Sequence, residues 1–284
     1  MNHADHTTYE HIIHMLLCCL AGLGIGTLAV WGYQKIKENK NHNPWILFLL
    51  KILIMRIPTL IVDNFYEDPD RVRDFALSLD YPDSSDRYPG KRTSSLKLIN
   101  KNFFDYCTKK VNSLLFSSKD RHECEVNTSF QYIEPFSSEV ENYGWIHNDK
   151  PCLFTCILYL TPNVNLNSGT SIYHENENFD IEKFEKFSDS RKTLYGSSFV
   201  DEKYEENWRL HREMFTETVR VDNVYNRLLI FDAQQWHGVP TYNTSTMGRL
   251  TQTFFLTKLI SETPPPITRS NNVKFDFSEL KTNL

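Results

Sequence analysis

The stretch Gly144-Trp145-Ile146-His147-Asn148-Asp149 is the point from which the fold of this 284-residue chain can be worked out. His147 and Asp149 lie two positions apart, and this spacing places both side chains on one face of a β-strand or of its immediate extension. His237 follows a second apolar strand, residues 227–232, and a short polar turn. Two imidazoles and one carboxylate that face the same space are the ligand set typical of non-haem Fe(II) sites. We therefore predict that His147, Asp149 and His237 bind a metal ion.

Two other histidines compete with His237 for the place of third ligand. His174 ends an apolar strand but has no arginine at a suitable distance downstream, and His211 lies in a charged segment typical of an exposed helix. Arg249, by contrast, follows His237 and opens an apolar strand in which Arg249 and Thr251 share one face. Because a guanidinium matches a carboxylate with two parallel hydrogen bonds, these two residues are the predicted grip on a ligand carboxylate.

The order of these residues resembles the 2-oxoglutarate/Fe(II)-dependent dioxygenase superfamily, and within it the prolyl-hydroxylase-like branch, over roughly residues 126 to 258. The resemblance implies Fe(II) as the metal, 2-oxoglutarate as the co-substrate, O2 as the oxidant and ascorbate as a supporting reductant. It also implies that Arg249 binds the distal carboxylate of 2-oxoglutarate, with help from Thr251 and Tyr132. The fold that it implies is a double-stranded β-helix of the jelly-roll or cupin type, in a mainly β chain with flanking helices.

The activity implied by the resemblance is hydroxylation of an unactivated C–H bond, with release of succinate and CO2. A peptidyl side chain is the expected substrate, although that expectation rests on the fold family alone. Two alternatives stay open. One is a small-molecule- or nucleobase-directed oxygenase of the same superfamily, and the other is a non-catalytic, membrane-tethered binding module on the same fold. The intact set of His147, Asp149, His237 and Arg249 argues against the binding module.

The composition of the chain limits the kinds of partner and metal site that can be expected. The formal net charge is −5 and no long basic run occurs, so binding to nucleic acid through its phosphates has little support. The six cysteines form no Cys-x-x-Cys pair, which favours reduced thiols in a reducing compartment over a disulfide framework or a zinc site. The substrate, whether a protein or a small molecule, is not identified by the sequence.

An appended N-terminal leader, residues 1–54, precedes the predicted catalytic domain. Residues 12–33 are apolar over a length that suits a membrane-spanning helix, and a second, shorter apolar segment covers residues 45–54. Lysines follow the first segment, so the positive-inside rule predicts a membrane-anchored protein whose domain lies on the cytoplasmic side. If translation starts at Met55 instead, a soluble cytoplasmic protein is expected.

The domain itself is expected over residues 55–262, followed by a C-terminal tail, residues 263–284. Apolar alternation and helical spacing of apolar residues set the expected elements. Strands are predicted at residues 60–62, 125–133, 154–160 and 170–174, and helices at residues 70–79 and 102–116. An acidic, aromatic and helical insertion is predicted at about residues 175–220.

Overall fold

The computed structural model describes residues 59–82, 85, 87–116, 122–197, 202–245 and 247–261. The predicted leader with its membrane-spanning segment and the predicted tail lie outside these ranges. None of the helices in the described ranges combines the length and the apolar character that a bilayer crossing requires.

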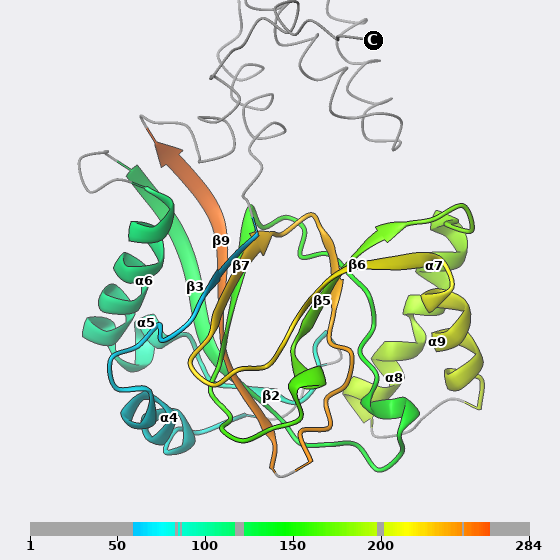
Figure 1. Ribbon diagram of the computed structural model, residues 1–284, viewed down its shortest axis with the longest axis horizontal. Helices are drawn as coiled ribbons and strands as arrows, with labels where there is room; N and C mark the ends of the chain where they lie inside the picture. The colour runs from blue at the N-terminus through cyan, green and yellow to red at the C-terminus, as the bar shows by residue number, and fades with distance from the viewer. Residues whose placement is uncertain are drawn as a thin grey trace, which may run out of the picture. The chain divides into compact units, whose positions relative to one another are not determined.

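A six-stranded antiparallel sheet forms the larger layer of the fold (Figure 1). In spatial order its strands are β1 (Leu60–Val62), β7 (Leu228–Asp232), β4 (Phe154–Tyr159), β9 (Arg249–Ser261), β3 (His122–Ile133) and β2 (Lys91–Arg92). All five residues of β7 are buried, as expected for a strand covered on both faces. The strands predicted at residues 60–62, 125–133 and 154–160 are therefore confirmed, and β3 begins earlier than predicted, at His122.

A second, three-stranded antiparallel sheet contains β6 (Phe215–Val221), β5 (Thr170–Glu175) and β8 (Trp236–Gly238), in that order. The two sheets pack against each other through a buried cluster to which both contribute, formed by Tyr159, Leu229 and Phe231 from the larger sheet and Ile172 and Val221 from the smaller one. Full burial of each such side chain stabilises the fold by roughly 1.5–3 kcal/mol. This cluster fixes the position of one sheet relative to the other.

Helices cover the other face of the larger sheet. They are α4 (Pro69–Leu77), α5 (Leu96–Ile99) and α6 (Lys101–Leu115). Asp68 begins α4 by accepting a hydrogen bond from the backbone N–H of Arg71. Phe75 of α4 and Phe103 of α6 pack on Phe130 of β3, with ring centroids 6.1 and 6.4 Å from that of Phe130. The two helices predicted at residues 70–79 and 102–116 are confirmed within two residues at each end.

The predicted insertion contains three helices, α7 (Ile181–Ser188), α8 (Ser190–Ser197) and α9 (Tyr204–Arg212), which lie together beside the smaller sheet (Figure 1). Helices occur within residues 181–212 of this segment, as predicted, and its last residues belong to a strand. Residues 215–221 form strand β6, in which threonine and valine residues pair with β5. Two short 3₁₀ helices, Val140–Asn142 and Leu166–Ser168, complete the described elements. The mainly β class with flanking helices is confirmed at this level.

Candidate metal centre and its cavity

The two predicted histidine ligands lie side by side because their backbones form an isolated antiparallel bridge. The N–H of His147 donates to the carbonyl of His237 at 2.9 Å, and the reverse bond measures 2.8 Å. Gly144 permits this close approach, since a Cβ atom there would lie 2.4 Å from the carbonyl oxygen of Val239. Gly144, the first residue of the stretch 144–149, therefore allows this segment to pack closely against the segment that carries His237.

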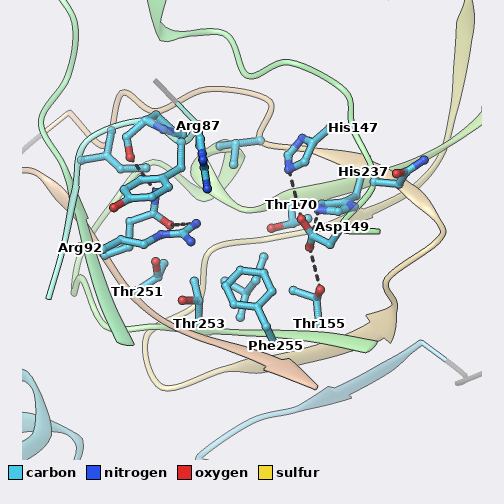
Figure 2. Close-up of a pocket in the computed structure, with 18 of the residues that line it drawn as sticks. Arg87, Arg92, His147, Asp149, Thr155, Thr170, His237, Thr251, Thr253 and Phe255 are labelled. Carbon is cyan, nitrogen blue, oxygen red and sulfur yellow. Dashed lines mark hydrogen bonds and ion pairs between the residues drawn. The ribbon is translucent and has the colours of Figure 1, made fainter. Parts of the chain in front are cut away.

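Asp149 is brought to the histidines by its own backbone and side chain. Its N–H donates to the carbonyl of Ala233 at 2.8 Å, and the hydroxyl of Thr155 donates to Oδ2 at 2.7 Å. Oδ1 lies 3.8 Å from Nε2 of His147, and Oδ2 lies 3.3 Å from Nε2 of His237. One ligand atom from each of the three residues therefore falls within 4.8 Å of the others, as a shared metal ion requires (Figure 2).

Backbone carbonyls set the tautomer of both imidazoles. Nδ1 of His147 lies 2.9 Å from the carbonyl oxygen of Trp145, and Nδ1 of His237 lies 2.9 Å from that of Gln235. A carbonyl only accepts, so each Nδ1 carries the proton and each Nε2 presents a lone pair to the centre. Protein-bound metal ions commonly hold histidines in this way, with the outer nitrogen anchored to a backbone oxygen.

The ionisation states of His147 and Asp149 suit a divalent cation, whereas His237 shares an Nε2 proton with Asp149 that a bound metal ion would displace. Burial, together with repulsion from His237, lowers the pKa of His147 to about 3, so this ring is neutral at pH 7. Burial acts to raise the pKa of Asp149, but attraction and hydrogen bonding from His237 outweigh it and hold that pKa well below 3.8. For His237, burial lowers the pKa while the carboxylate of Asp149 raises it more. Two imidazoles and one carboxylate anion match the ligands that Fe(II) prefers.

Arg249 and Thr251 line the same cavity of about 550 Å³ as the three ligands. Nε of Arg249 donates to the carbonyl of Ser168 at 2.7 Å, and its Cζ lies 5.5 Å from the ring centroid of Tyr159. Among the described residues, the buried guanidinium forms no ion pair and the buried hydroxyl of Thr251 has no hydrogen-bond partner. A buried cation and an unsatisfied hydroxyl side by side fit the carboxylate of a ligand.

Tyr132 is the predicted site residue that the structure does not bring to this cavity. Gln131 and Ile133 of β3 line the cavity, and the alternation of a strand sends Tyr132 to the opposite face. There its ring covers Gly248, where a Cβ atom would lie 2.6 Å from the tyrosine hydroxyl. The placement expected for Tyr132 is therefore corrected, whereas His147, Asp149, His237, Arg249 and Thr251 are found together.

The rival histidines are both outside the centre. His174 is exposed at the end of β5, in agreement with the choice of His237. His211 was expected on an exposed helical face, and this is wrong. It is fully buried, with its ring centroid 4.8 Å from that of Trp145 and 5.1 Å from that of Phe184. The aromatic residues of the insertion and of the deciding stretch enclose it.

Several residues of the cavity were missed by sequence reasoning. Thr155 could have been found, because it is the polar residue near the start of the predicted strand 154–160 and lies only six positions after Asp149. Others come from a short edge strand, a loop and the insertion, where no periodicity indicates direction; they are Arg87, Arg92, Arg191, Tyr195 and Tyr242.

The fold and the site thus define a mainly β protein with a candidate mononuclear metal centre between two sheets. The chain belongs to the family of unknown function DUF6445, whose model matches residues 50–256. No curated protein matches it.

Solved structures similar to the chain are 2-oxoglutarate–Fe(II) oxygenases, including prolyl hydroxylases, as the sequence resemblance anticipated. A prolyl hydroxylase from Trichoplax adhaerens, in complex with a peptide fragment of the hypoxia inducible factor oxygen degradation domain, is 16% identical with a TM-score of 0.39, over 76% of this chain and 87% of that one. HygX from Streptomyces hygroscopicus, with nickel and 2-oxoglutarate bound, is 14% identical with a TM-score of 0.41, over 76% and 87%.

Proposed function

We propose that this protein is an Fe(II)- and 2-oxoglutarate-dependent oxygenase that hydroxylates an unactivated C–H bond. One observation carries the proposal. A single cavity contains two imidazole Nε2 atoms and a carboxylate that converge within 4.8 Å, together with a buried guanidinium that has no ion-pair partner among the described residues. We interpret the two packed sheets as the two sides of a double-stranded β-helix. The substrate proposed is a peptidyl side chain, with a small molecule as the alternative.

Each residue of the set has a distinct proposed role. His147, His237 and Asp149 would hold Fe(II) and leave coordination positions open for the co-substrate and O2. Arg249 would grip the distal carboxylate of 2-oxoglutarate, with the hydroxyl of Thr251 donating to the same group. When bound, Fe(II) and 2-oxoglutarate supply an oxidation in which one oxygen atom of O2 enters the substrate C–H bond and the other converts 2-oxoglutarate to succinate and CO2.

The surrounding residues hold this set in place. Carbonyls of Ser168 and Gly169 orient the guanidinium of Arg249, at 2.7 and 3.5 Å, so little side-chain freedom is lost when a carboxylate binds. The ring of Phe231 lies against His237, with centroids 4.6 Å apart, and covers it from the side of the core. These contacts support a pre-organised binding site on rigid strands.

The test measures metal binding, 2-oxoglutarate binding and succinate formation separately. Purified full-length protein is loaded with Fe(II) anaerobically, titrated with 2-oxoglutarate, and then exposed to air with ascorbate. Arg249→Gln is expected to keep the metal and to weaken 2-oxoglutarate binding by about 10- to 100-fold, since charge-assisted hydrogen bonds are lost. His147→Ala is expected to lose metal and succinate formation together.

Arg71→Gln is the matched control, because Arg71 is exposed on α4, outside the cavity. It removes the same charge and should change none of the three measurements. Metal-loaded wild-type protein that fails to bind 2-oxoglutarate would refute the proposal. Binding without succinate formation, even with candidate peptides and small molecules, would favour the binding-module alternative.

A further inference from the structure

The cavity carries a charge opposite to that of the whole protein. The chain has a net charge of −5, yet, of the residues that the structure describes, five cationic side chains and one carboxylate line the cavity. The cations are Arg87, Arg92, Lys150, Arg191 and Arg249, and the carboxylate is the metal-ligating Asp149. Arg249 has a proposed partner in 2-oxoglutarate. The other four cations exceed what the proposed co-substrate needs.

Arg92 is held in a fixed position by its surroundings. Its guanidinium Cζ lies 4.0 Å from the ring centroid of Tyr88 and 5.2 Å from that of Phe255, and its Nη2 donates to Oε1 of Gln131 at 3.2 Å. Its Nε is buried and has no hydrogen-bond partner in the part of the chain that the structure describes. An unpartnered buried donor on an immobilised arginine is costly to the fold unless a ligand satisfies it.

Two more arginines approach the same space. Arg191 lies on α8 and Arg87 in the loop before β2, and neither side chain has an ion pair or hydrogen bond to another described residue. Figure 2 shows Arg87 and Arg92 across the cavity from His147 and Asp149. Burial lowers the pKa of Arg92, while the charge of Asp149 acts in the opposite direction, which indicates that the arginine lies within electrostatic range of the metal ligands.

Arg92 is separate from the proposed 2-oxoglutarate anchor. Arg92 projects from edge strand β2, opposite Gln131 of β3, and Arg249 projects from β9 on the far side of β3. Two strand spacings, about 10 Å, therefore separate the backbones from which these arginines arise. Arg249 also turns toward the start of β5, where it binds the Ser168 carbonyl. One small diacid held at Arg249 and the metal would leave Arg92 free.

We propose that Arg92, with Arg191 and Arg87, forms a second anion subsite that binds a carboxylate or phosphate group of the substrate. The substrate is accordingly an anionic molecule whose reacting carbon lies between this subsite and the metal centre. The role of this subsite in binding a substrate rests on the proposed function, whereas the binding of an anion at Arg92 does not. A planar arginine edge suits both carboxylate and phosphate, so the two chemistries are separated by experiment.

The experiment titrates two probes, inorganic phosphate and acetate, into metal-free full-length protein at pH 7. Affinity is measured from the concentration-dependent rise of the thermal midpoint. Arg92→Gln and Arg191→Gln are each expected to weaken binding of the preferred probe by at least about tenfold, the loss that one charge-assisted hydrogen bond gives. The preferred probe identifies the anion as phosphate or carboxylate. The exposed-arginine variant Arg71→Gln should bind as the wild type does.

Two further variants keep the proposal falsifiable. Arg92→Lys retains the charge and the stem but loses the fork, so its affinity should fall between those of wild type and Arg92→Gln. Arg249→Gln should change the affinity for phosphate or acetate by less than roughly threefold, although it weakens the binding of 2-oxoglutarate. Wild-type protein that binds neither probe, binding that survives Arg92→Gln unchanged, or binding that disappears in Arg249→Gln alone would overturn the second subsite. If 2-oxoglutarate does not bind, the proposed function is refuted, but the phosphate and acetate measurements still test the second subsite.

Discussion

His211 predicts a loss of stability in mild acid. Its ring is fully buried among aromatic residues of the insertion, and apart from a weak interaction with the backbone of Ile146 neither ring nitrogen has a hydrogen-bond partner among the described residues. Burial, followed by repulsion from Arg191, His147 and Arg212, lowers its pKa to about 3, although the backbone of Ile146 acts slightly in the other direction. The folded protein therefore keeps this imidazole neutral, while the unfolded chain protonates it near its ordinary pKa of 6.5.

The sign and size follow from proton linkage. Between pH 6.5 and pH 3 the unfolded state binds the proton and the folded state does not, so the free energy of unfolding falls as the pH falls through this window. One pKa unit corresponds to about 1.4 kcal/mol, and pH 5 lies about 1.5 units below the unfolded pKa. The contribution of His211 to stability should thus decrease by about 2 kcal/mol between pH 7 and pH 5.

Urea unfolding of wild type and His211→Leu at pH 7 and pH 5 measures this quantity. A chelator is present throughout, so that release of metal from His147 and His237 does not contribute. Leucine fills the aromatic surroundings without a polar atom, so the variant should be at least as stable as wild type at pH 7 and lose about 2 kcal/mol less on acidification. His174→Leu, which changes an exposed histidine outside the cavity, is the matched control. Equal losses in wild type and His211→Leu would show that the buried ring accepts a proton, and the reasoning would fail.

Two predictions concern the support of the site. Thr155→Val removes the hydroxyl that donates to Asp149 at 2.7 Å and should weaken Fe(II) binding by about 10- to 100-fold in an anaerobic titration, whereas Thr253→Val, which alters a cavity hydroxyl bonded to Ser129, should not. Gly169→Ala places a Cβ atom 1.9 Å from the carbonyl oxygen of Val221 and should cost roughly 1–3 kcal/mol in urea unfolding. Because Gly169 also orients Arg249, unchanged stability and unchanged 2-oxoglutarate affinity in this variant would contradict the close packing described.

Strand alternation explains why the metal ligands could be predicted from sequence. Residues two positions apart share a face regardless of which strands lie beside them, and this local rule places Arg249 with Thr251 and His147 with Asp149. The approach of His147 to His237 depends on a long-range backbone bridge, which the sequence did not predict; only the strand before His237 indicated where that residue would lie. The predicted part of the site therefore comes from short-range geometry.

The placement expected for Tyr132 came from the family resemblance, and alternation alone could not have corrected it because the cavity is polar. An alternating strand is normally read with its apolar residues facing the interior between the sheets, and in β3 these include Phe130 and Tyr132. Here that face turns outward to Phe75 and Phe103 of the covering helices, while Gln131 faces the cavity opposite Thr251. Which face of a strand covered on both sides borders a ligand cannot be decided without its neighbours.

The charges that line the cavity indicate which class of ligand it can bind. The chain as a whole is negative, and at physiological ionic strength charges are screened beyond about 8 Å, so the acidic exterior gives an approaching anion no long-range attraction. The five cations act only on groups that have already entered the cavity, where burial weakens screening. Recognition of an anionic substrate would therefore come from contact with fixed groups such as Arg92 and would appear in the dissociation rate more than in the association rate. The cavity would therefore favour ligands whose negative charge lies at a fixed distance from the metal. Such positioning would hold one carbon atom of the substrate at the metal centre, as hydroxylation requires.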